Sequence, residues 1–206
     1  MSDSLARRGL ARAAAGLNAR GRVAGRLPSL VLITDDERLP DPLPAVRALP
    51  RGSAVIVRSR KSGRRRELAA AVVAIARHRG LVVLIADDAQ LARQCGADGI
   101  HLPEARARES AHWRARRPGW LITVAAHSLG AAVQAPRADA LLLSSIFATQ
   151  SHPGRSPLSP ARANFIAHMS RLPVYALGGV DARNAALLRD RNFAGIAAIS
   201  ALRVQT

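Results

Sequence analysis

Short apolar runs alternate with longer polar stretches along most of the chain. The apolar runs are rich in β-branched residues and occupy residues 30–34, 54–57, 81–85, 99–102, 121–125, 140–147, 174–177 and 196–199. Continuous runs of this kind are typical of parallel strands, which are buried on both faces. Most gaps between them contain a stretch of helical character, namely 65–79, 89–95, 128–135, 160–169 and 182–190. The pattern predicts eight strands that alternate with helices.

Eight successive βα units predict an α/β fold of the closed (β/α)8 class, a TIM barrel. The barrel is short for this class, because Ala201 to Thr206 leave no room for a full eighth helix. The N-terminal segment is a candidate to cover that gap. A doubly wound open sheet is the alternative fold.

The first 28 residues differ in composition from the barrel that we assign to residues 29–206. They are rich in Ala and Arg and contain one acidic residue, Asp3. This composition is typical of a transit peptide. An exposed basic helix or a disordered arm is the interpretation that we favour, because Arg is abundant throughout the chain.

The formal net charge is +17, which is typical of nucleic-acid-binding proteins. However, the basic residues are scattered over most of the predicted helices, and aromatic residues for base stacking are scarce, at 3% of the chain. We therefore expect the charge to attract small anionic substrates rather than to bind nucleic acid specifically.

No apolar run approaches the ~18 residues of a membrane span. We expect a cytoplasmic protein without a membrane partner, and we leave open whether it forms a homo-oligomer. Cys95 is the only cysteine, which excludes an intramolecular disulfide.

The carboxyl ends of barrel strands carry the active site in this fold class, so the residues that follow each run are the ones to inspect. Gly178 and Gly179 follow the seventh run, and Ser200 follows the eighth. This is the usual place for a phosphate site, and a Cβ there would hold the phosphate away from the backbone. The alternative is that the glycines only permit a tight turn.

Arg58 and Arg60 follow the second run, and residues two apart in a strand point to the same side. Two guanidinium groups inside a barrel mouth are costly without anions, so we expect an anionic group there, with a diphosphate as one candidate. The alternative is that the strand ends one residue earlier and both side chains reach solvent.

Asp87 and Asp88 end the third run. We assign Asp87 to a Mg²⁺ that bridges a diphosphate, and Asp88 to the N-cap of the next helix. His127 follows the fifth run, and its role as a site residue or as a core histidine stays open. For His101 we favour a structural role.

A polar loop follows the sixth run, and loops at this place often close over substrate. It offers hydroxyl and imidazole donors in Thr149, Ser151 and His152.

Several motifs in this order resemble the thiamine phosphate synthase family and its relatives, the TenI-type thiazole tautomerases. They are residues 96–102, 127–128, 146–152, 176–180 and 198–202, within a resemblance that covers about residues 29 to 202. The resemblance implies a transferase of thiamine biosynthesis. Such an enzyme joins hydroxymethylpyrimidine diphosphate to thiazole phosphate, giving thiamine monophosphate and diphosphate.

The resemblance also implies roles for individual residues. Arg58, Arg60 and His152 match catalytic residues that hold the diphosphate or form the loop, and Asp87 matches the magnesium aspartate. The positions that match substrate contacts are Thr149, Ser151, Gly178, Gly179 and Ser200, with His127 as a further candidate.

The chain departs from the family pattern on the pyrimidine side. Ala86 stands where the family has Asn, and Arg106 stands in place of the second metal carboxylate. Glu104 is a candidate to replace that ligand, and His152 stands in place of a lysine. The chain is therefore a divergent member, and a non-catalytic or regulatory binder of thiazole phosphate is the alternative function. A basic nucleic-acid-associated protein is a third and weaker hypothesis.

Overall fold

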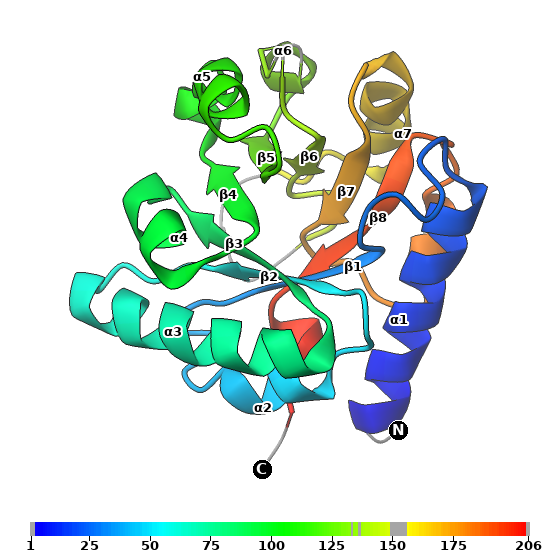
Figure 1. Cartoon of the computed structure of the whole chain (residues 1–206). Helices are drawn as coiled ribbons and strands as arrows, with labels where there is room; N and C mark the ends of the chain where they lie inside the picture. Colours follow the sequence, from blue (N-terminus) through cyan, green and yellow to red (C-terminus); the bar gives the residue numbers. More distant parts are fainter. Residues whose placement is uncertain (1–2, 133, 136, 149–155, 205–206) are drawn as a thin grey trace.

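The computed structural model describes residues 3–132, 134–135, 137–148 and 156–204. Eight parallel strands pair in sequence order and close into a barrel, with helices on the outside (Figure 1). The strands are β1 Leu30–Ile33, β2 Ala54–Val57, β3 Val82–Ala86, β4 Gly99–Leu102, β5 Leu121–Ala126, β6 Ala140–Leu143, β7 Val174–Leu177 and β8 Phe193–Ala198. The predicted TIM barrel is confirmed, and the open-sheet alternative is wrong.

The outer layer contains helices of very different length. The α-helices are α1 Asp3–Arg20, α2 Leu43–Ala48, α3 Ser62–Arg79, α4 Ala89–Cys95, α5 Glu109–Arg116, α6 Leu129–Ala132 and α7 Pro160–Met169. Three short 3-10 helices complete the chain: η1 Glu104–Arg106, η2 Ala185–Leu187 and η3 Ser200–Leu202. None of the helices among the described residues combines the length and apolar character needed to cross a membrane.

The helix expected at residues 182–190 does not form, and only the turn η2 lies there. The carboxylate of Asp181 accepts hydrogen bonds from the backbone N–H groups of Arg183 and Asn184, at 2.8 and 2.9 Å. The Asn184 amide in turn donates to the Gly179 carbonyl at 2.7 Å. These short polar side chains satisfy the backbone in a non-helical turn, which explains the difference.

The seam between β1 and β8 closes the barrel, with Leu30 paired to Ile196 and Val31 to Ala197. Gly195 lies on this seam, directly against Ser29, the residue before β1. A Cβ at this position would lie 1.9 Å from the Ser29 carbonyl oxygen. Only glycine therefore allows the two strands to approach closely enough to pair.

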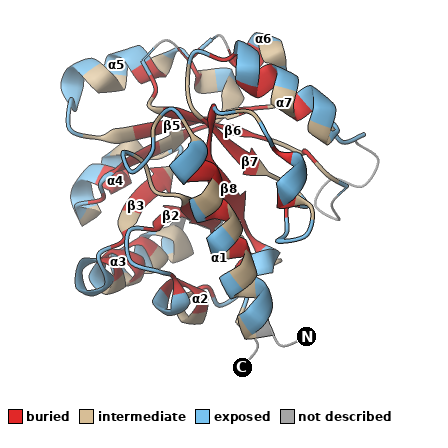
Figure 2. Cartoon of the chain, turned by 90° about the vertical axis from the view of Figure 1, so that its right-hand side faces the viewer, coloured by how far each residue is buried: buried red, intermediate tan, exposed pale blue. Residues whose placement is uncertain are grey.

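Helix α1 covers β8 and takes the place of a helix after the last strand (Figure 1). Leu10, Ala14 and Leu17 are buried along one face of α1. The outer face of the helix, which is turned to the viewer in Figure 2, is mainly exposed or half-buried. The buried Asn18 amide donates to the Ala194 carbonyl of β8 at 2.7 Å. The expected basic helix is confirmed for α1, but the helix is not a free or disordered arm, because its apolar stripe packs on β8 and covers the gap in the outer layer.

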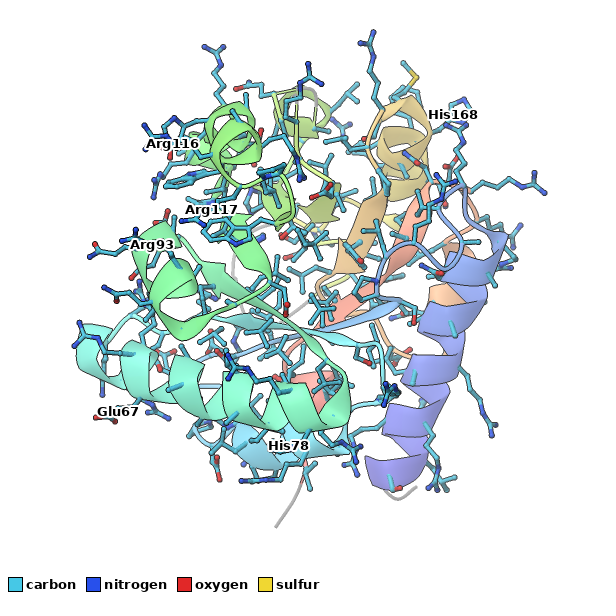
Figure 3. All side chains as sticks on the ribbon, in the orientation of Figure 1. Glu67, His78, Arg93, Arg116, Arg117 and His168 are labelled. Carbon is cyan, nitrogen blue, oxygen red and sulfur yellow. The ribbon has the colours of Figure 1, made fainter. Side chains whose placement is uncertain are left out.

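The basic residues are spread over the outside of the barrel. Arg93 on α4, Arg116 on α5 and Arg117 just beyond α5 are exposed and project from the outer layer in Figure 3. Arg93 comes from α4 and the other two from the end of α5.

The packing of α1 predicts a contrast between two leucines of the same helix. Leu10→Ala removes a buried side chain and should lower the free energy of unfolding by about 2–5 kcal/mol. Leu5→Ala is the matched control, because Leu5 is 53% exposed and its truncation should change stability by less than ~0.5 kcal/mol. Urea unfolding of the three proteins checks this, and equal midpoints would show that α1 adds nothing to the fold.

Candidate functional site

A cavity of about 540 Å³ opens at the carboxyl ends of the strands. It brings together most of the residues predicted from the sequence, namely Arg58, Arg60, Asp87, His127, Gly178, Gly179 and Ser200. Glu104 contacts His127 from outside the lining. Thr149, Ser151 and His152 lie outside the described residues.

Two glycines after β7 form one wall of the cavity. Gly178 and Gly179 have φ values of +94° and +66°, which disfavour any other residue. A Cβ on Gly178 would lie 2.8 Å from the Ser145 Cα, and one on Gly179 would lie 2.5 Å from the Ala148 carbonyl oxygen. The glycines are therefore required both by conformation and by space.

The same wall offers backbone donors. Within the part of the chain that the structure describes, no acceptor pairs with the backbone N–H of Gly179 or of Ser200. Ser200 is exposed at the start of η3 and adds a hydroxyl group. Unpaired N–H groups beside a hydroxyl at this end of a barrel are suited to a phosphate.

Arg58 follows β2 and is held in place on another part of the cavity wall. Its backbone N–H donates to the Thr34 hydroxyl, and that hydroxyl donates to the Arg58 carbonyl, both at 2.8 Å. Its guanidinium contacts the Asp35 carboxylate at 3.2 Å, and Arg38 contacts the same oxygen at 2.8 Å. Burial opposes ionisation of Asp35, but the hydrogen bonds and charge of Arg38 outweigh it and lower the pKa to about 2. Asp35 is thus a permanent anion that positions Arg58.

Arg60 differs from Arg58 because only its backbone is anchored. Its N–H donates to the Asp36 carboxylate at 2.9 Å, and the Ser59 hydroxyl donates to the same oxygen at 3.1 Å. Burial raises the pKa of Asp36, but these two hydrogen bonds outweigh it and leave the pKa lowered. The Arg60 side chain is exposed and has no partner among the described residues. It is therefore available to an anion in the cavity.

Asp87 lines the cavity, and its carboxylate contacts a positively charged side chain. Arg106 pairs with the Asp87 carboxylate and, on its other side, donates two hydrogen bonds of 2.6 Å to Glu109. The Glu109 carboxylate raises the pKa of Arg106, and Arg106 lowers that of Glu109. Asp88 caps α4 as expected, since it accepts from the Leu91 N–H at 2.8 Å.

Glu104 is directed to His127 rather than to Asp87. Its Oε2 accepts from the His127 backbone N–H at 2.8 Å and lies 2.5 Å from the ring Nδ1. In the described ranges, no three His, Cys, Asp or Glu side chains gather as a metal site would require. The arrangement around Asp87 and Glu104 does not fit a magnesium ion held by both carboxylates, and Mg²⁺ binding stays a prediction.

His101 is a cavity residue to which sequence reasoning gave only a structural role. Its Nδ1 lies 2.9 Å from the Thr123 hydroxyl. Burial, and then the charge of Arg58, lower its pKa to about 4, so the ring is neutral at pH 7. Thr34 and Asp35 follow the first strand and are among the positions that the rule of strand ends selects, but no role was predicted for them.

Comparison with known proteins agrees with the fold. The family model described as thiamine monophosphate synthase matches residues 30–202. The chain belongs to this family. A thiamine-phosphate synthase of Chlorobium luteolum is 36% identical over 85% of this chain and 85% of its own, and one of Thiobacillus denitrificans is 32% identical over 82% of each.

A solved structure, thiamine phosphate pyrophosphorylase from Pyrococcus furiosus, has a TM-score of 0.68 at 24% identity. It covers 89% of this chain and 88% of its own. At this identity the likeness supports the barrel fold alone.

The lowered pKa of His101 predicts a pH-dependent stability. Between pH 6.5 and about 4 the unfolded chain binds a proton at this residue that the folded chain excludes, so stability falls as the pH falls. This residue should contribute up to ~1.4 kcal/mol per pH unit in that window. Urea unfolding from pH 7 to 4.5 should give a shallower slope for His101→Gln than for the wild type, and equal slopes would contradict the buried neutral ring.

Proposed function

We propose that this protein is a thiamine-phosphate synthase, which joins hydroxymethylpyrimidine diphosphate to thiazole phosphate and releases diphosphate. The family membership and the curated relatives that bear this name support the proposal. The observation that carries it is the cavity itself, which is lined both by arginines and by glycine and serine residues with free N–H groups among the described residues.

The two sides of the cavity suit the two substrates. Arg58 and Arg60 offer guanidinium donors to a diphosphate, because planar guanidinium groups pair well with phosphate oxygens. Gly179 and Ser200 offer N–H groups to the single phosphate of the thiazole. Two anion sites in one cavity would hold the reacting carbon and nitrogen close together.

The proposed reaction needs little from the protein beyond charge and shielding. The bond between the pyrimidine methylene carbon and the diphosphate oxygen breaks, and the bonding electrons leave with the diphosphate. The thiazole nitrogen then donates its lone pair to the methylene carbon and forms the new bond. Arginines in fixed positions stabilise the negative charge of the departing diphosphate. Such electrostatic stabilisation is usually the largest single contribution to catalysis.

The lining between the two sides would protect the pyrimidine cation from water. Its apolar members among the described residues are Ile33, Ala86, Ala125, Leu177, Val180, Ala197, Ala198, Ile199 and Ala201. His101 is neutral at pH 7 and so adds no positive charge beside the cation.

A direct assay tests the proposal. The purified chain should convert the two substrates to thiamine monophosphate and should restore growth of a synthase-deficient strain without thiamine. Failure of both, with and without Mg²⁺, would overturn the proposed activity.

The second candidate function is a binder of thiazole phosphate without catalysis. It is favoured by the pairing of Asp87 with Arg106, which departs from the family's carboxylate pattern. Calorimetry separates the two, since a binder takes up thiazole phosphate but not the pyrimidine diphosphate.

The phosphate wall predicts the effect of a charge at Ser200. Ser200→Asp places a carboxylate beside the N–H groups and should weaken thiazole phosphate binding at least tenfold, about 1.4 kcal/mol. Gln94→Asp is the control, because it adds the same charge on the exposed side of α4. Calorimetry with thiazole phosphate checks this, and equal affinities for the two variants would place the phosphate elsewhere.

A further inference from the structure

We propose that Arg106 acts as a resident cation in the diphosphate site, so that this protein binds the diphosphate without a divalent metal ion. This inference rests on the proposed function, because it concerns the diphosphate of that substrate. It deepens the proposal by assigning a role to the ion pair between Arg106 and Asp87.

The first observation is that the carboxylate facing the cavity is already neutralised. Asp87 lines the cavity and pairs with Arg106, which comes from η1. Glu109 holds the guanidinium from behind through two hydrogen bonds of 2.6 Å. A metal ion at Asp87 would have to displace this guanidinium or lie beside its positive charge.

The second observation is that Arg106 keeps donors to spare. A guanidinium carries five N–H groups, and the contacts with Asp87 and Glu109 use three of them. The other two have no partner among the described residues. The side chain is 40% exposed, so these donors are open to solvent next to Asp87, which lines the cavity.

The third observation is the balance of charge around the cavity. Its described lining contains four arginines, Arg38, Arg58, Arg60 and Arg65, but a single carboxylate, that of Asp87. Asp35 pairs with Arg38 and Arg58, and Asp88 lies 3.8 Å from Arg65. Because Arg106 compensates Asp87, the charge of Arg60 stays available in the lining without a metal. Arginine side chains thus supply the positive charge with which a divalent ion would neutralise the diphosphate.

Three proteins test the proposal: the wild-type full chain, Arg106→Gln and Arg106→Asp. Calorimetry measures binding of inorganic diphosphate and of hydroxymethylpyrimidine diphosphate, in EDTA and in excess Mg²⁺. The wild type should bind in EDTA with a Kd within about threefold of that in Mg²⁺. Arg106→Gln should lose at least tenfold in both conditions.

Arg106→Asp places a second carboxylate beside Asp87, and its binding should be weak in EDTA and recover with Mg²⁺. Mn²⁺ electron paramagnetic resonance gives an independent measurement. Arg106→Asp should bind Mn²⁺ in the absence of diphosphate, and the wild type should not. Arg108→Asp is the matched control, because Arg108 is exposed two residues away, and it should behave as the wild type.

The outcomes separate this inference from the proposed function. A wild type that makes thiamine monophosphate but binds diphosphate only with Mg²⁺ would overturn the role of Arg106 and leave the activity standing. Metal-independent binding without product would support Arg106 and overturn the activity. Unchanged binding by Arg106→Gln, with the fold verified by circular dichroism, would also overturn the inference.

Discussion

The hydrogen-bonded seam between β1 and β8 joins the first and last strands and so places all eight strand ends on one rim. Residues from distant parts of the chain meet there only because the barrel is closed. The seam depends on Gly195, whose missing side chain leaves room for the Ser29 carbonyl. It also depends on α1, which covers β8 and ties it through Asn18. The positions of the site residues therefore depend on the contacts that the N-terminal part of the chain makes with β8.

Carboxylates at the rim orient arginines. Asp35 holds the Arg58 guanidinium, Asp36 holds the backbone of Arg60, and Asp87 pairs with Arg106. Each acid follows a strand, so its position is fixed by the barrel. Fixed cationic groups need little rearrangement when an anion binds or departs, which is the physical basis of electrostatic catalysis.

Much of the fold could be predicted because buried parallel strands leave a simple signal in the sequence. The continuous apolar run at residues 54–57 matches β2, and the expected helices at 89–95 and 160–169 match α4 and α7. The expected helix at 182–190 failed because Asp181 and Asn184 form side-chain hydrogen bonds that no apolar pattern records.

The location of the site could be predicted from the sequence, but the pairing of its side chains could not. The rule of strand ends located Arg58, Asp87 and the two glycines, since these lie next to the backbone that the barrel fixes. The partners of long side chains could not be predicted in this way. Arg106 reaches Asp87 across 19 positions of the chain, and Glu104 turns to His127. Such choices depend on side-chain conformations, which the pattern of apolar positions does not encode.

The position of α1 also has a consequence for synthesis of the chain. The ribosome makes α1 before the strand that it covers, β8, and most of the other elements lie between the two. Until β8 has been made, the stripe of Leu10, Ala14 and Leu17 lacks its main partner. The barrel can therefore close, and this stripe be covered, only after β8 has been made.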